Sequence, residues 1–450
     1  MPNEKKVGMV SLGCSKNQVD GEMMLALIKD GGFQLCNDPL QCDVVIINTC
    51  GFIEDAKRES IESIMEFCEL KQSGKIKAVI VTGCLAERYR EEIAEEIPEA
   101  DVILGIGHNK DIVAAVNDAL AGKHLVSFGE KTDLPLNGKR VLANAPYFAY
   151  LKLGDGCDNW CSYCAIPMIR GAFRSRPMED VITEAKQLVA DGVKEINLIA
   201  QDTSRYGEEL YGKLMLPQLL TELCKIEGLV WVRLLYCYPD RITDELINVI
   251  AAEDKIVKYL DIPIQHANKR ILTAMNRFGD KETILALVEK IRAEIPDITL
   301  RTTLIAGFPG ETEDEFTELC EMVHEAKFDR LGCFAYSAEE DTPAAEMDGQ
   351  LDEQQKHHRA EIVMTEQYDI AMEVGRKQLG KIVKVLVEGF DEKINLYYGR
   401  SAADAPDIDT KVYFKGSAHL KEGDFIWVKI KKLKEYDLLG FQVAEPKRKD

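Results

Sequence analysis

The first 125 residues alternate short apolar runs with segments of helical periodicity. The apolar runs are rich in Val and Ile and are bounded by turn residues, which predicts strands at 7–12, 43–48, 77–82 and 101–106. Between them, apolar residues recur at spacings of three and four, as in an amphipathic helix. Because continuous apolar strands joined by helices form parallel sheets covered on both faces, we expect an α/β domain over residues 1–125.

A second alternation of strands and helices covers residues 147–375. Six strands are predicted, at 148–153, 194–200, 230–237, 259–264, 299–306 and 331–336. Helical periodicity separates them, notably over 178–191, 214–226, 243–252, 280–293 and 312–326. Six such units indicate a partial (β/α)6 barrel rather than a closed eightfold one. The preceding residues 126–146 contain Pro and Gly and lack periodicity, so we interpret them as a linker.

The pattern changes again at about residue 376. Short apolar segments such as "KIVKVLVEG" and "DFIWVKIKKL" are divided by turns that contain Gly and Asp, with no helical period. Residues 376–450 are therefore predicted to form a small antiparallel β-barrel of the OB-like kind. The expected fold class is α/β, with this barrel as its only all-β part.

Composition and charge limit the classes of protein that fit. No apolar run approaches the ~18 residues of a membrane span, and the apolar stretch after Lys5 and Lys6 is too short for a signal peptide. We therefore expect a cytoplasmic protein with no membrane association. The net charge of −21 disfavours the whole chain as a polyanion binder, because phosphate neutralisation needs clustered Lys and Arg. It suits a basic partner.

Three cysteines stand close together after the first strand of the predicted barrel. Cys157, Cys161 and Cys164 form the pattern C-x3-C-x2-C within "GDGCDNWCSYCAIP". In a reducing compartment such cysteines are metal ligands, catalytic groups or packing residues rather than disulfides. Three thiolates can hold a four-iron cluster and leave one iron free for another ligand. The alternative is a structural zinc site that borrows a distant fourth ligand.

A second cysteine triplet is spread over the first domain. Cys14, Cys50 and Cys84 each follow the end of a predicted parallel strand, in "SLGC", "INTCG" and "VTGC". Because such strand ends line one crevice in an open α/β sheet, the three thiols can converge as a further cluster site. Packing in the core is the alternative for each cysteine. The remaining cysteines lack this register and are interpreted as packing residues: Cys36, Cys42, Cys68, Cys224, Cys237, Cys320 and Cys333.

The first of these motifs carries a resemblance to a known superfamily. C-x3-C-x2-C with an aromatic residue, Tyr163, before the last cysteine resembles the signature of radical S-adenosylmethionine enzymes. The resemblance implies that the free iron chelates S-adenosylmethionine and that an electron cleaves it to a 5′-deoxyadenosyl radical. "TTLIAGFPGET" at 302–312 looks like the strand and turn that such enzymes place beside the cofactor. Gln201 and Gln265, at predicted strand ends, could reach the cofactor or could simply close the strands.

The two triplets together resemble the methylthiotransferases over nearly the whole chain. That family joins an N-terminal cluster domain, a radical S-adenosylmethionine barrel and a C-terminal TRAM β-barrel. It implies two 4Fe-4S clusters and S-adenosylmethionine as cofactors, with an electron donor such as flavodoxin or ferredoxin. Cys157, Cys161 and Cys164 would then hold the radical-generating cluster, and Cys14, Cys50 and Cys84 an auxiliary cluster that handles sulfur. The chemistry would belong to the cofactors, so no side chain is assigned a catalytic role.

The family divides by substrate, and two stretches favour one branch. "SLGCSKNQVDGE" (11–22) and "LIAQDTSRYG" (198–207) look like the branch that modifies the β-carbon of an aspartate in small-subunit ribosomal protein number twelve. Gly21 stands where that branch has serine. Residues 376–450 carry a net charge of +4 and the other 375 residues −25, which suits a basic ribosomal protein better than tRNA. The alternative is 2-methylthio transfer to a tRNA adenosine.

Two hypotheses from other classes stay open on the sequence. An iron–sulfur electron carrier also needs clustered cysteines, although it needs neither an open iron nor a barrel. A nucleic-acid-binding module could act through the C-terminal β-barrel, since fold alone does not specify function. Only the enzyme should release 5′-deoxyadenosine and methionine when it is reduced with S-adenosylmethionine without oxygen.

Overall fold

The computed structural model describes residues 5–417 and 419–447. The N-terminal domain is a parallel sheet with the order β2-β1-β3-β4-β5-β6. Its strands are β1 (Lys6–Ser11), β2 (Gln34–Leu35), β3 (Val44–Thr49), β4 (Ala78–Gly83), β5 (Val102–Leu104) and β6 (Leu125–Ser127). Every residue of β3 and β4 is buried, because helices cover both faces of the sheet. These helices are α1 (Ser15–Asp30), α2 (Glu54–Gln72), α3 (Cys84–Glu96) and α4 (Ile112–Leu120).

The second domain is a six-stranded parallel sheet with the order β14-β13-β12-β11-β10-β7. Consecutive units are neighbours, as in a partial β/α barrel. The strands are β7 (Phe148–Lys152), β10 (Glu195–Ile199), β11 (Trp231–Leu234), β12 (Ile256–Asp261), β13 (Thr299–Ala306) and β14 (Arg330–Ala335). The helices are α6 (Met178–Ala190), α7 (Glu208–Tyr211), α8 (Leu216–Cys224), α9 (Asp244–Ala252), α10 (Lys269–Ala274), α11 (Lys281–Glu294), α12 (Glu313–Ala326) and α13 (Glu353–Lys377).

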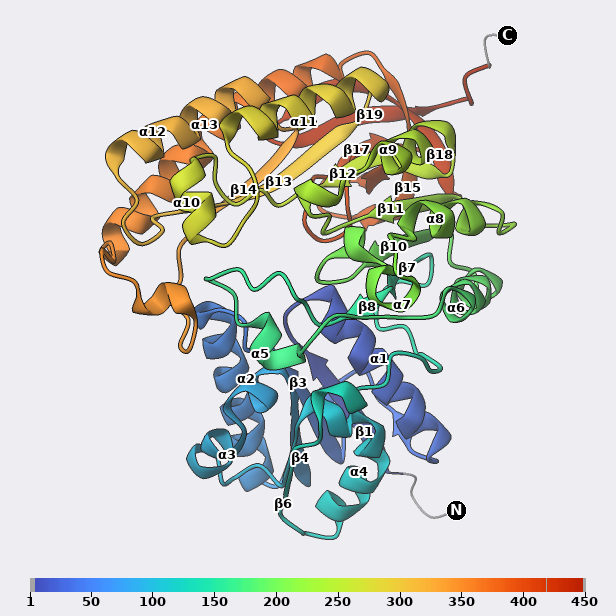
Figure 1. Ribbon diagram of the computed structural model, residues 1–450. Coiled ribbons are helices and arrows are strands. Elements are labelled where there is room, and N and C mark those ends of the chain that lie inside the picture. The colour runs from blue at the N-terminus through green and yellow to red at the C-terminus, as the bar shows by residue number, and fades with distance from the viewer. Residues whose placement is uncertain (1–4, 418, 448–450) are drawn as a thin grey trace.

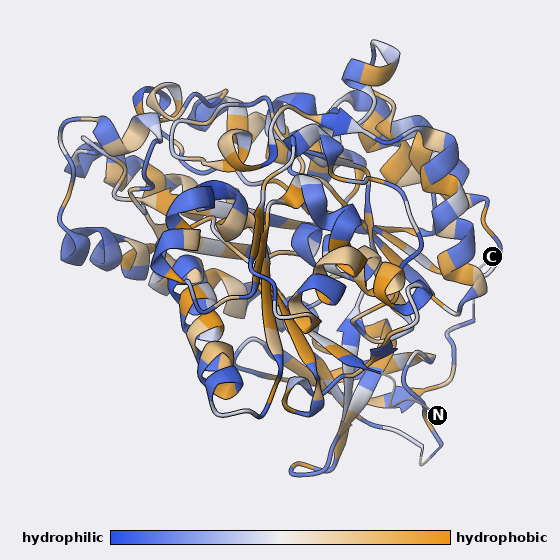
Figure 2. Cartoon of the chain, turned by 90° about the horizontal axis from the view of Figure 1, so that it is seen from below, coloured by the Kyte–Doolittle hydropathy of each residue, from blue (hydrophilic) through white to orange (hydrophobic). Residues whose placement is uncertain are grey.

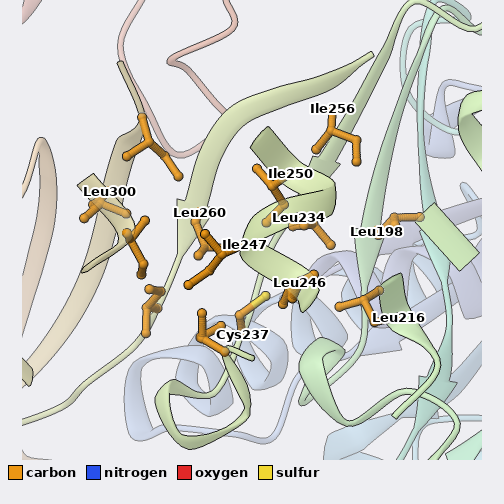
Figure 3. Close-up of a cluster of buried hydrophobic side chains, with 14 of the residues drawn as sticks. Leu198, Leu216, Leu234, Cys237, Leu246, Ile247, Ile250, Ile256, Leu260 and Leu300 are labelled. Atoms are coloured by element: carbon orange, nitrogen blue, oxygen red, sulfur yellow. The ribbon is translucent and has the colours of Figure 1, made fainter. Parts of the chain in front are cut away.

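Alternate residues of the barrel strands pack against the helices. Leu198, Leu234 and Leu260 project from β10, β11 and β12 and meet Leu246 and Ile250 of α9 in one buried hydrophobic cluster (Figure 3). The hydrophobic strands accordingly form an orange centre, while hydrophilic residues occupy much of the surrounding helices (Figure 2). Burial of these Leu and Ile side chains, at about 1.5–3 kcal/mol each, provides the main driving force for this layer.

The C-terminal domain is a closed barrel with the strand order β15-β16-β17-β19-β18. The strands are β15 (Ile382–Asp391), β16 (Leu396–Ser401), β17 (Val412–Lys415), β18 (Phe425–Lys434) and β19 (Asp437–Val443). Arg233 of β11 donates to the carbonyl of Ala402, and Tyr259 of β12 donates to Asp409 at 2.7 Å. The segment between β16 and β17 therefore closes the amino-terminal end of the partial barrel, opposite to the strand ends that carry the cysteines.

The N-terminal domain lies at the other end of the partial barrel. The short helix α5 (Ile166–Arg170) and the hairpin of β8 (Gly154–Asp155) and β9 (Arg174–Ser175) lie between the two (Figure 1). This architecture confirms the predicted fold class of a parallel-sheet α/β domain, a partial barrel and a small β-barrel. Among the described residues, no helix is both long enough and apolar enough to cross a membrane.

Candidate functional site

The sequence Cys157–Cys164 forms a loop between β8 and α5, beyond the carboxyl end of β7. Gly156 starts this loop with φ at +82°, and a Cβ atom there would lie 2.1 Å from the carbonyl oxygen of Ala172. The turn therefore requires glycine. Cys157 then donates its backbone N–H to the carbonyl of Gly171 at 3.1 Å. These contacts hold the cysteine loop over the mouth of the barrel.

The three thiols of this loop lie within electrostatic range of one another. The pKa of Cys157 is raised to about 11, chiefly by burial, with a smaller contribution from the neighbouring Cys161. Burial also raises the pKa of Cys164, with smaller contributions from Cys161 and Cys157. A set of close, buried thiols that resist ionisation on their own is stabilised as thiolates by a bound metal. The loop thus fits the donor set of an iron–sulfur cluster.

Two side chains from neighbouring elements reach the middle cysteine. The hydroxyl of Tyr238, just after β11, lies 3.1 Å from the Sγ atom of Cys161. The guanidinium of Arg277 stacks on the Tyr238 ring at 3.8 Å from its centroid. Sequence reasoning missed both residues, although Tyr238 shares the strand-end position that singled out the two glutamines. Hydrogen bonds of this kind orient metal ligands and tune the bound metal.

The second triplet also comes together, at adjoining strand ends. Cys14 caps α1 after β1, Cys50 follows β3, and Cys84 begins α3 after β4. The pKa of Cys50 is raised to about 12, chiefly by burial and to a smaller extent by the charges of Cys84 and Cys14. The parallel register of β1, β3 and β4 places these ends side by side. The expected convergence is therefore present in the structure.

Glycine makes this arrangement possible. Gly13 has φ at +87°, and a Cβ atom on it would lie 2.7 Å from the Sγ atom of Cys50. Gly83, with φ at +97°, would place a Cβ atom 2.4 Å from the carbonyl oxygen of Thr49. Both positions lie where the backbone must approach the neighbouring strand end, so larger residues would push the thiols apart.

Among residues 5–417 and 419–447, no group of three Cys, His, Asp or Glu side chains is arranged to hold a single metal ion. That the cysteines ligate clusters stays a prediction.

The predicted cofactor-contacting glutamines present unpartnered acceptors. The Oε1 atoms of Gln201 and Gln265 are buried without a hydrogen-bond partner among the described residues. Gln265 has φ at +72°, a strained backbone for a non-glycine residue. Because buried polar atoms are normally paired, these two acceptors fit a ligand such as S-adenosylmethionine. Tyr163 packs against an apolar group that includes Ile271 and Met275. The cofactor contacts of Tyr163 and of both glutamines stay predictions.

Buried ion pairs join the N-terminal domain to the barrel beside the second triplet. Lys152 and Arg170 of the barrel both pair with Asp20 of α1 and with Asp155. All four side chains are at most 1% exposed. Two cations thus neutralise two carboxylates at the boundary, which is the condition under which charges are tolerated inside a protein. These ion pairs fix the N-terminal domain against the barrel next to Cys84, which Arg170 also contacts.

Three regions of the chain match known protein families. Residues 6–105 match the uncharacterized protein family UPF0004, residues 151–323 the Radical SAM superfamily, and residues 379–443 the TRAM domain. Among solved structures, the radical S-adenosylmethionine methyltransferase TsrM from Kitasatospora setae is similar, with a TM-score of 0.55 and 15% identity. The match covers 76% of this chain and 75% of that one. At this identity the likeness establishes the fold alone.

Curated relatives are much more similar in sequence. The ribosomal protein uS12 methylthiotransferase RimO of Desulforamulus reducens is 51% identical over 442 residues, which cover 96% of this chain and 98% of the relative. The protein of the same name from Clostridioides difficile is 49% identical, covering 97% of this chain and 98% of the relative. The chain therefore belongs to the family of ribosomal protein uS12 methylthiotransferases within the radical S-adenosylmethionine superfamily.

Proposed function

We propose that this protein is a radical S-adenosylmethionine methylthiotransferase that replaces a hydrogen on the β-carbon of an aspartate in ribosomal protein uS12 with a methylthio group. The observation that carries the proposal is the presence of two three-thiol sites, one on the loop beyond the first barrel strand and one at adjoining strand ends of the N-terminal domain. Relatives about 50% identical over nearly their whole length bear this name.

Each triplet is proposed to hold one 4Fe-4S cluster. Cys157, Cys161 and Cys164 would hold the radical-generating cluster, leaving one iron for the amino and carboxylate groups of S-adenosylmethionine. Cys14, Cys50 and Cys84 would hold the auxiliary cluster. When bound, these groups supply the electron that cleaves S-adenosylmethionine and the site at which sulfur is handled. The structural support is the convergence of three thiols in each place.

The chain's own residues would bind S-adenosylmethionine, orient a cluster ligand and shield the radical from water. Gln201 and Gln265 have buried, unpartnered acceptors and are proposed to accept hydrogen bonds from S-adenosylmethionine. Tyr163 is proposed as a further contact from within the cysteine loop. Tyr238 orients Cys161 through its hydroxyl. The N-terminal domain, which lies at this end of the barrel, is proposed to restrict water at the mouth, which would protect a radical from side reactions.

The charge distribution supports a protein substrate. The chain outside the C-terminal barrel carries a net charge of −25 and the barrel itself +4. A positively charged ribosomal protein, free or in the ribosome, is attracted to such a surface, whereas a polyanionic tRNA is repelled. A low-potential donor such as flavodoxin or ferredoxin is proposed to supply electrons. We expect the reaction in the cytoplasm, where this substrate is found.

The test is mass spectrometry of uS12 and of bulk tRNA from cells with and without the gene. The proposal expects the methylthio mass increment on the uS12 aspartate to disappear in the deletion strain and to return with the intact gene. The tRNA nucleosides should be unchanged. If tRNA loses a 2-methylthio adenosine while uS12 keeps its modification, the tRNA alternative is correct instead.

A further inference from the structure

One buried guanidinium links the two cysteine triplets. Arg170 ends α5, six residues after Cys164 of the barrel triplet. Its Nη2 atom donates across the domain boundary to the Sγ atom of Cys84, 3.3 Å away. Its Nη1 atom donates to Asp20 at 2.8 Å and to Asp155 at 2.7 Å. The side chain is 1% exposed, so its orientation is set entirely by these partners.

The ion pairs hold Arg170 in place without using all of its donors. Asp20 and Asp155 bind one edge of the guanidinium, and Lys152 balances the second negative charge of this carboxylate pair. The Nη2 atom is thereby free of the carboxylates and donates to the Cys84 sulfur at 3.3 Å and to Asn17 Oδ1 at 3.4 Å. A planar, permanently charged fork fits this arrangement in a way that the point charge of lysine does not.

Attachment of the two domains does not by itself require this contact. Arg140, in the segment before β7, forms a second buried link by pairing with Glu22 of α1 at 2.5 Å and with Glu184 of α6 at 2.6 Å. That link contacts no cysteine. Because buried ion pairs contribute little net stability relative to apolar packing, a cation directed at a thiol suggests a role in the chemistry of that thiol.

A hydrogen bond from a cation to a ligand thiolate has a defined electronic effect. It withdraws electron density from the sulfur and stabilises the more negative, reduced state of the attached cluster. Hydrogen bonds to the ligand sulfurs are among the features that set the reduction potential of iron–sulfur clusters, and partners of the ligands tune a bound metal generally.

We propose that Arg170 is a positioning residue for the auxiliary cluster, whose N–H···Sγ bond to Cys84 raises the potential at which that cluster accepts one electron. The inference rests on the proposed function, because it assumes that Cys84 is a ligand of this cluster. It also explains why the guanidinium lies on the helix that follows the barrel triplet. Helix α5 then connects the cysteine loop of the barrel, which precedes it, with Cys84, which its Arg170 contacts.

The experiment is a dithionite redox titration of the full-length, two-cluster protein, followed by electron paramagnetic resonance. A Cys161→Ala chain, in which only the auxiliary signal should remain, assigns the two signals. The test variant combines Arg170→Gln with Asp155→Asn. It removes one positive and one negative charge, so that the charges of Lys152 and Asp20 still neutralise each other. Arg170→Lys keeps the positive charge but loses the planar guanidinium with its two Nη donors. Arg140→Gln is the matched control, since it breaks a buried interdomain ion pair that touches no cysteine.

The proposal expects the midpoint of the auxiliary cluster to become more negative in the double variant, while the radical-generating cluster keeps its midpoint. Arg170→Lys should fall between the double variant and the wild type, and Arg140→Gln should leave both midpoints unchanged. An unshifted auxiliary midpoint in the double variant overturns the proposal, as does an equal shift in Arg140→Gln. If the wild-type chain holds a single cluster, the proposed function itself fails, and that result is visible in the iron content before any variant is compared.

Discussion

Glu339, in the segment after β14, accepts a hydrogen bond from Arg88 of α3 across the domain boundary at 2.8 Å. The carboxylate is 1% exposed and also accepts from the backbone N–H of Glu54, at the start of α2, at 3.0 Å. Lys57 lies 3.3 Å away. This group of buried charges secures the N-terminal domain through elements other than those that Arg140 joins.

We predict that Glu339→Gln loosens this attachment. The substitution leaves Arg88 and Lys57 as buried cations with too little compensating charge, which costs about 3–5 kcal/mol in comparable cases. The expected results are a lower thermal midpoint and faster proteolysis between residues 126 and 146. Glu340→Gln is the control, because the Glu340 side chain is 63% exposed and surface pairs contribute about 0–1 kcal/mol. Equal effects of both substitutions would contradict the role of Glu339.

The two cysteine triplets should have separable functions. Cys161→Ala is expected to lose about half of the iron and all formation of 5′-deoxyadenosine, because the radical-generating cluster lacks a ligand. Cys50→Ala is expected to lose a similar amount of iron, to keep 5′-deoxyadenosine formation and to lose sulfur transfer. Iron analysis and product chromatography under anaerobic conditions measure both. Loss of radical cleavage in Cys50→Ala, with the barrel still folded, would refute this division.

Tyr238→Phe should affect only the barrel cluster. The substitution removes the hydroxyl 3.1 Å from the Sγ atom of Cys161, and a hydrogen bond to a charged group contributes about 1.5–3 kcal/mol. We expect a more negative midpoint for the radical-generating cluster and slower 5′-deoxyadenosine formation. The auxiliary signal serves as the internal reference in the same titration. A shift in both clusters would indicate a general structural change instead.

Gly13→Ala should disturb the auxiliary site more than an equivalent glycine substitution elsewhere. Gly13 and Gly32 both have φ at +87°, but a Cβ atom on Gly13 would lie 2.6 Å from the Cβ atom of Cys50, whereas Gly32 has open space around it. Each substitution costs about 1–2 kcal/mol for the left-handed backbone. Only Gly13→Ala is expected to lose auxiliary-cluster iron as well. If both variants retain the same amount of iron, the contact of the new Cβ atom with Cys50 does not disturb the auxiliary site, and the prediction is wrong.

Attachment of the C-terminal barrel should weaken in acid. Burial alone would raise the pKa of Glu195, but Arg400 of β16 and Arg233 of β11 outweigh it and hold the pKa below its ordinary value. The ionised carboxylate therefore stabilises the fold at pH values above the unfolded-state pKa of about 4.3. This contribution is lost as the pH falls through the lower pKa of the folded state. Denaturation midpoints between pH 7 and 3 measure it, and Glu195→Gln should remove this part of the pH dependence.

The strand-end positions of the cysteines follow from local patterns. Cys14, Cys50 and Cys84 each stand after an apolar run bounded by glycine or threonine, and parallel strands joined by helices bring such ends to one edge of a sheet. The same argument places Cys157 beyond the first barrel strand. The alternation of strands and helices, the three-part order of the chain and both triplets were therefore accessible to sequence reasoning alone.

Only the tertiary structure decided which charged residues face these sites. Arg170 and Cys84 are 86 residues apart, Arg88 and Glu339 251, and Glu195 and Arg400 205. Nothing local distinguishes these side chains from the many other charged residues of the chain. Their pairing depends on how whole domains dock, because a buried charge is tolerated only where a distant partner compensates it. Periodicity and spacing specify each domain separately, whereas the contacts between domains arise only when the folded surfaces meet.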